Sequence, residues 1–179
     1  MNQMTLKSTT RKLLFILSFA MLFSFSSQAQ RIASVDINLI LESMDDYQKA
    51  QEQLDQVASK WRQEIAQEYD KIKGMYNRYQ SEQVLMSEDV RKQKEEEIMN
   101  KEKQVREMQK EKFGPEGDLF KKREELVRPI QDKVYEAIES YANEKGYDFI
   151  FDKGGATGIL FANERYDKTS DLLKRLGVK

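Results

Sequence analysis

The sequence predicts an α+β fold that is predominantly α, with a long antiparallel helical hairpin on a small β-rich oligomerisation body. Three observations predict it. An apolar heptad rhythm runs through residues 47–141 and reverses once near its middle. Strand-like segments flank that stretch, in residues 30–46 and 142–179. A Gly-Pro-Glu-Gly stretch at residues 114–117 breaks the returning helix. We therefore expect residues 47–141 to form a helical arm and the two flanks to form the body.

The N-terminal segment, residues 1–29, has the pattern of a secretory signal peptide. A basic start precedes an uncharged apolar run at residues 13–25, and Ser27 and Ala29 occupy the small-residue positions of a cleavage site. The run is short for a membrane-spanning helix, which needs about 17–25 apolar residues. We therefore expect cleavage after Ala29 and a secreted mature chain; a retained N-terminal anchor is the alternative.

The composition argues against catalysis. The sequence contains no Cys and no His, so it lacks a thiol nucleophile, disulfides, and the imidazole base or metal ligand that proteins use most often. The carboxylates of residues 95–97 are consecutive on a predicted helix and point in different directions. We expect no enzymatic activity, cofactor or metal. Without its basic signal peptide the chain is mildly acidic, which argues against nucleic acid as a partner.

The outgoing helix of the arm is predicted from residue 47 to about residue 85. Its seam skips one heptad position, where Glu68 stands. A tight reversal is expected at residues 85–89, because Ser87 is a good N-cap and acidic residues follow it. The apolar seam consists of Leu54, Ala58, Trp61, Ile65, Ile72, Met75 and Tyr79.

The returning helix is predicted from Glu88 towards Glu144. We expect a break or bend at residues 114–117, where a plain loop joining two separate helices is an equal alternative, and a milder kink at Pro129. Gly146 is expected to end the helix. The seam consists of Ile98, Val105, Met108, Leu119, Leu126, Ile130, Val134 or Ala137, and Tyr141.

The body is predicted to contain one strand at residues 31–36, a short helical turn at 38–44, a β-hairpin formed by residues 147–152 and 158–162, and a last helix at 171–176. Sheets of this size are marginal in isolation. One short helix cannot cover all of the large apolar side chains, so we expect the body to oligomerise. The side chains concerned are Phe149, Phe151, Leu160 and Phe161.

The order of these elements resembles the Skp/OmpH family of periplasmic outer-membrane-protein chaperones. A signal peptide, the strand RIASVD, a long charged hairpin, YDFIFD, a Gly-containing turn, GILFA and a final TSDLLKRL helix follow one another over essentially the whole mature chain. The resemblance implies a homotrimer whose β-rich body carries three helical arms around a cavity. It assigns six residues to the trimeric body: Ile32, Val35, Phe149, Phe151, Leu160 and Phe161.

The resemblance also implies a function, that of an ATP-independent holdase. Such a chaperone sequesters unfolded outer-membrane β-barrel proteins between its arms. Met and aromatic side chains suit an adaptable binding surface. The candidate client contacts are Met75, Tyr76, Tyr79, Leu85, Met86 and Met99. We place Met75, Tyr79 and Met99 on the seam, so packing between the helices is the favoured interpretation for them. Tyr76 and Met86 are the better contact candidates.

Two further expectations concern partners. The tip of the arm, residues 71–112, carries a small excess of positive charge, which favours a weak contact with an anionic membrane surface, although an ordinary solvated coiled-coil surface has the same pattern. The alternative function is a periplasmic coiled-coil scaffold or adaptor that binds one folded envelope partner rather than unfolded chains.

Overall fold

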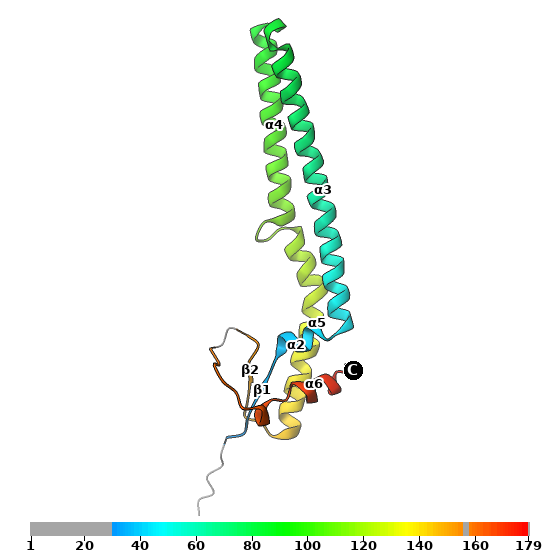
Figure 1. Ribbon diagram of the computed structural model, residues 1–179, viewed down its shortest axis with the longest axis vertical. Coiled ribbons are helices and arrows are strands. Elements are labelled where there is room, and N and C mark those ends of the chain that lie inside the picture. The colour runs from blue at the N-terminus through cyan, green and yellow to red at the C-terminus, as the bar shows by residue number, and fades with distance from the viewer. Residues whose placement is uncertain (1–29, 156–157, 179) are drawn as a thin grey trace, which may run out of the picture. The chain divides into compact units, whose positions relative to one another are not determined.

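The structure, a computed structural model, describes residues 30–155 and 158–178, so the expected signal peptide lies outside the described residues. Four helices account for most of this part of the chain: α2 (Ile37–Glu42), α3 (Asp45–Glu82), α4 (Glu88–Phe113) and α5 (Asp118–Lys145). A short sheet of β1 (Ile32–Val35) and β2 (Phe149–Asp152) and a last helix, α6 (Thr169–Arg175), complete the unit (Figure 1). The predicted fold class, α+β and predominantly α, is confirmed.

The helix α3 forms one side of the arm, and α4 followed by α5 returns along it (Figure 1). The chain reverses through a 3₁₀ turn, Gln83–Leu85, after which the Ser87 hydroxyl accepts a hydrogen bond from the Val90 N–H as an N-cap. Apolar residues at heptad spacing form the seam. Its outer part buries Ile65, Ile72, Ile98 and Val105, and its inner part buries Ala50, Leu54 and Val127.

The Gly-Pro-Glu-Gly stretch separates α4 from α5. Neither Gly114 nor Gly117 has a positive φ; what both positions require is the absence of a side chain. A Cβ at Gly114 would collide with the Lys110 carbonyl oxygen, and a Cβ at Gly117 would lie 2.6 Å from the Glu111 carbonyl oxygen. By contrast, α5 continues through Pro129 without ending. Gly146, with φ of 67°, ends α5 in the left-handed conformation that glycine adopts most easily.

The two strands of the body pair in parallel, with Ile32 opposite Phe149 and Ser34 opposite Phe151. A parallel pair needs a long crossover connection, and here the whole arm supplies it. One face of the sheet packs on α2, α5 and α6. The core between them consists of Val35, Ile40, Leu41, Met44, Val134, Tyr141 and Leu172.

The predicted β-hairpin is wrong. Residues 158–162 form no strand in the described chain, and the strand partner of β2 is β1. The free edge of β1 is also engaged, because the Lys168 N–H donates to the Ser34 carbonyl oxygen at 2.8 Å. The segment is apolar enough for a strand, but strand propensity needs a paired neighbour to take effect. Leu160 is accordingly 99% exposed and Phe161 84% exposed.

Candidate functional site

The outer face of the sheet carries aromatic side chains that the described chain does not cover. Phe149 and Phe151 alternate with Ile150, which packs towards the core. Their rings stack with centroids 6.1 Å apart. Ile32, opposite Phe149 in the parallel register, lies on the same face, because paired residues point to the same side of a sheet. Phe149, Phe151 and Ile32 remain 50%, 46% and 41% exposed.

Next to this face is an apolar groove of about 480 Å³. Phe151 belongs to the groove and to the exposed face, so the two surfaces are continuous. Ser34 also lines the groove, and its buried hydroxyl has no hydrogen-bond partner among the described residues. The rest of the lining is mainly Ile32, Ala33, Ile159, Phe161, Ala162 and Tyr166. Together, the groove and the sheet face (the base face, below) form an apolar surface without a cover in the described chain.

Five of the six residues expected in the oligomerisation body are exposed on this side of the sheet or in the segment after it: Ile32, Phe149, Phe151, Leu160 and Phe161. Val35 differs. It is 1% exposed and belongs to the core of its own chain, beneath the sheet. Alternation along β1 explains the difference, since neighbouring side chains of a strand point to opposite faces. Val35 therefore supports the base face from below and is not part of it.

A polar network holds the base face in place. The Thr169 hydroxyl accepts a 3.0 Å hydrogen bond from the Asp36 N–H and donates one of 2.6 Å to Asp167. Asp152, at the end of β2, accepts hydrogen bonds from the N–H groups of Ile37 and Gly154. These contacts join the first and last parts of the described chain. The sheet and the segment after it are thereby tied to α2 and α6, which the sequence alone did not indicate.

The candidate client contacts on the arm divide into two groups. Tyr76 is 41% exposed, Leu85 90% and Met99 56%. Met75 and Tyr79 are half-buried and pack against the outer seam. Met86 is also half-buried and lines a small hollow at the tip. The interpretation of Met99 as a packing residue is wrong, because its neighbour Ile98 fills the seam position instead.

Polar contacts cross the seam beside these residues. Tyr76 donates a 3.1 Å hydrogen bond to Glu102, and Tyr79 donates one to Glu95. These hydrogen bonds raise the pKa of both tyrosines above the ordinary value. At the skipped heptad position, Glu68 pairs with Lys101 of α4. The hydroxyls are thus directed to α4, while the ring of Tyr76 remains partly exposed to a partner.

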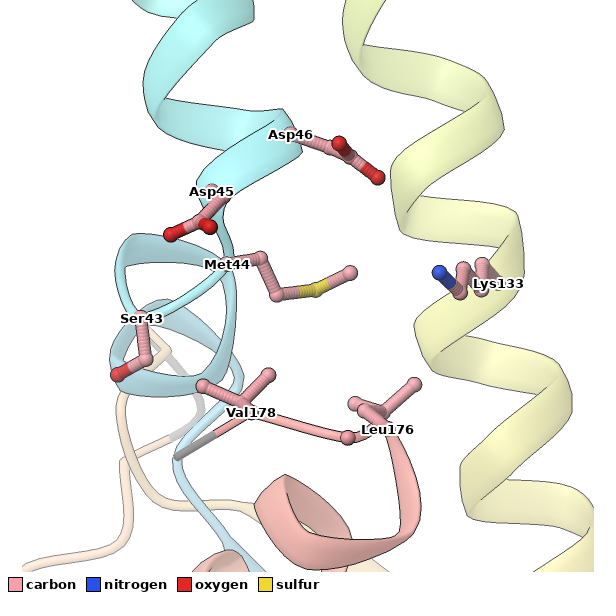
Figure 2. Close-up of a pocket in the computed structure, with 8 residues that line it drawn as sticks. Ser43, Met44, Asp45, Asp46, Lys133, Leu176 and Val178 are labelled. Carbon is pink, nitrogen blue, oxygen red and sulfur yellow. The ribbon is translucent and has the colours of Figure 1, made fainter.

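A separate hollow of about 370 Å³ lies where α2 meets α3, beside α5 and the end of α6. Figure 2 shows Met44 directed into it, with Leu176 and Val178 on one side and Lys133 on the other. Asp45 and Asp46 lie on its rim. Among residues 30–155 and 158–178, no three potential His, Cys, Asp or Glu ligands gather closely enough to hold a metal ion.

The fold and the base face define a class of protein: a helical hairpin rooted in a small α/β base whose outer sheet face is apolar and uncovered. The chain belongs to the family of OmpH-like outer membrane proteins, whose sequence model matches residues 31–176. The family expected from the sequence is thereby confirmed. No curated protein sequence matches the chain.

A solved structure has a similar fold. It is the crystal structure of a Caulobacter crescentus CB15 protein proposed to be an outer membrane chaperone (OmpH-like). The TM-score is 0.67 at 9% sequence identity, and the match covers 84% of this chain and 86% of that chain. The similarity includes both the arm and the body. Within the part of the chain that the structure describes, no helix is long and apolar enough to cross a bilayer.

Proposed function

We propose that this protein is a periplasmic holdase chaperone that keeps unfolded outer-membrane β-barrel proteins soluble without ATP. Family membership supports a chaperone role. The observation that carries the finer proposal is the base face: a sheet with exposed aromatic side chains on a chain whose other large feature is a long arm. The mechanism is binding alone, with no catalytic step and no cofactor.

The base face supports assembly of several copies. Large contiguous apolar patches on a soluble protein mark interaction sites, and the stacked Phe149 and Phe151 continue into the groove beside Ser34. We propose that copies of this chain cover one another's base faces as a homotrimer. Residues 158–162 would then pack against apolar side chains of a neighbouring copy, because their own chain does not cover them. The arms would project side by side and enclose a space.

The arms supply weak, adaptable contacts. Exposed side chains of Tyr76, Leu85 and Met99 combine apolar surface with flexibility or a polar end. An unfolded β-barrel precursor presents apolar strands without a fixed shape, so many weak contacts suit it better than one rigid pocket. The mildly positive tip would add a weak contact with an anionic membrane surface, and cleavage of residues 1–29 would release the chain into the periplasm.

The test is an aggregation assay with several unrelated outer-membrane proteins. Each is diluted from urea in the presence of the mature protein, light scattering is followed, and the mass of the complex is measured under native conditions. We expect scattering to be suppressed for all of them at a fixed ratio of chaperone oligomer to client. A soluble protein that refolds rapidly serves as the control client. If the protein suppresses the aggregation of none of these clients, the holdase proposal is wrong. If it binds only one folded envelope protein, the alternative function as a scaffold is favoured.

A further inference from the structure

Few buried residues hold the helix α4 to the rest of the arm, although polar contacts such as Tyr76–Glu102 and Glu68–Lys101 also join it to α3. In its 26 residues the buried positions are Ile98 and Val105. Both belong to the outer-seam cluster with Ile65 and Ile72 of α3, and this cluster is separate from the clusters at the root of the arm and in the body. A helix attached through its own small cluster is a unit that can open separately from the remaining structure.

Both ends of α4 are turns. At the tip, residues 83–87 connect it to α3, and at the other end residues 114–117 connect it to α5. The second turn has a defined shape, because Gly117 is buried and a Cβ there would approach the Glu111 carbonyl oxygen to 2.6 Å. The end of α4 therefore has a specific closed position and is not a loose linker.

One side chain joins that end to both neighbouring helices. Lys112, in the last turn of α4, forms an ion pair with Asp118 of α5, with 2.6 Å between Nζ and Oδ2. The same ammonium lies 4.9 Å from the ring centroid of Trp61 on α3, a cation–π contact. Phe113 adds an edge-to-face contact with Trp61, with centroids 6.2 Å apart. The Asp118 carboxylate holds the pKa of Lys112 above its ordinary value.

We propose that α4 is a strap that opens from α3 as one unit, and that Lys112, held between Asp118 and Trp61, is the clamp that keeps it closed. Opening uncovers the outer seam around Ile65 and Ile72, which is an apolar surface. The use of that surface for unfolded clients rests on the proposed holdase function; the opening itself does not.

Hydrogen exchange followed by mass spectrometry tests the strap in the mature protein as it assembles in solution, without a client. A detached helix of this length is marginal in water, so opening exposes its amides to exchange. We expect the α4 peptides to exchange at one common rate, faster than peptides from the inner part of α3 and from α5 after Val127. If the exchange rates of the α4 peptides change gradually from the tip to the base of the arm, α4 does not open as one unit and the strap proposal is wrong.

Variants test the clamp. Lys112→Met removes the charge and keeps most of the apolar stem, and we expect α4 exchange to accelerate about fivefold, because an ion pair and a cation–π contact are lost together. Trp61 emission should shift to the red, and it reports on this site alone because the chain contains 1 Trp. The matched control is Lys122→Met in α5, whose partner Glu125 lies one turn away; it should leave α4 unchanged.

Asp118→Asn is the second variant and keeps Lys112 beside Trp61, so a smaller acceleration confined to α4 is expected. If α4 exchanges at the same rate in Lys112→Met and Lys122→Met, the proposed role of Lys112 as a clamp is wrong. It is also wrong if exchange accelerates in every helix in both the Lys112 and the Asp118 variants. No client is present in these experiments, so their results do not bear on the holdase proposal. The aggregation assay tests that proposal independently.

Discussion

Glu68 of α3 and Lys101 of α4 form an ion pair across the seam of the arm, with 2.6 Å between Lys101 Nζ and Glu68 Oε2. The Glu68 side chain is only 17% exposed and also pairs with Lys71 at 2.5 Å. Residues three or four positions away, Ile65 and Ile72, form the apolar cluster on either side. The carboxylate at the skipped heptad position thus has a partner in the opposite helix, and the pair joins the two helices across the seam.

The Glu68 ion pairs predict a pH-dependent stability of the arm. Hydrogen bonds from Lys101 and then Lys71 lower the pKa of Glu68 from 4.5 to about 2. A carboxyl group whose pKa is lower in the folded chain stabilises the fold above its unfolded pKa, and this contribution disappears as the pH falls towards the folded pKa. Glu68→Gln should therefore unfold at a lower urea concentration than the wild type at neutral pH, and the difference should shrink between about pH 4.5 and pH 2.

Circular dichroism in urea at several pH values measures this difference. Glu97→Gln is the matched control, because Glu97 pairs with Lys94 within α4 at a side-chain exposure of 54%. Exposed ion pairs contribute little, so this variant should unfold like the wild type at every pH. A difference between wild type and Glu68→Gln that stays constant down to pH 2 would show that Glu68 acts through packing and not through charge.

A second prediction concerns Thr169, which is 4% exposed. Thr169→Val keeps the shape of the side chain but leaves the Asp36 N–H without its acceptor, which costs about 1–3 kcal/mol for a buried group. Chemical denaturation should show this loss in the free energy of unfolding. Thr169→Ser retains the hydroxyl and should recover most of the stability, because the hydrogen bonds to Asp36 and Asp167 can form again. An unchanged free energy of unfolding in Thr169→Val would show that the hydrogen bonds of this hydroxyl do not stabilise the fold.

The sequence predicts the arm well, because its seam, caps and breakers act locally. The heptad rhythm, the Ser87 cap, the Gly146 terminus and the interruption at residues 114–117 all depend on residues within a few positions of one another. The ion pair of Glu68 with Lys101 could also have been predicted from the heptad pattern, because a charge at a seam position needs an opposite charge on the facing helix. The domain limits remain a prediction.

The body is predicted less well because its structure depends on distant residues. The apolar residues 158–162 look strand-like, but β2 pairs with β1 from the other end of the described chain, which local sequence does not indicate. The contact between Asp36 and Thr169 joins residues 133 positions apart and has no local signature. Val35 packs in the core of its own chain, and a four-residue strand does not indicate by its sequence which face meets the helices. Its role in an oligomeric body stays a prediction.

A third prediction tests the core of the body. Leu172 on α6 is 0% exposed and packs with Val134 and Tyr141 of α5. Leu172→Ala removes buried apolar volume and leaves a cavity, which should cost about 2–5 kcal/mol in the free energy of unfolding. Leu85→Ala is the control, since that side chain is 90% exposed at the tip and loses little by truncation. If both variants unfold at the same urea concentration, α6 does not belong to the cooperative core.

The base face supplies the last prediction, on assembly. Phe149→Asp places a charge on the proposed interface, and each Phe contributes about 1.5–3 kcal/mol when it is buried, so the oligomer should dissociate into monomers. Phe120→Asp is the matched control, because Phe120 on α5 is also 50% exposed but lies on the arm. Phe161→Asp repeats the test outside the sheet, where an Asp cannot weaken strand pairing. Native mass spectrometry measures the assembly, and circular dichroism verifies that each variant is folded. A folded Phe161→Asp variant that keeps the oligomer intact would place the interface away from the groove, because a charge cannot be buried there without a partner.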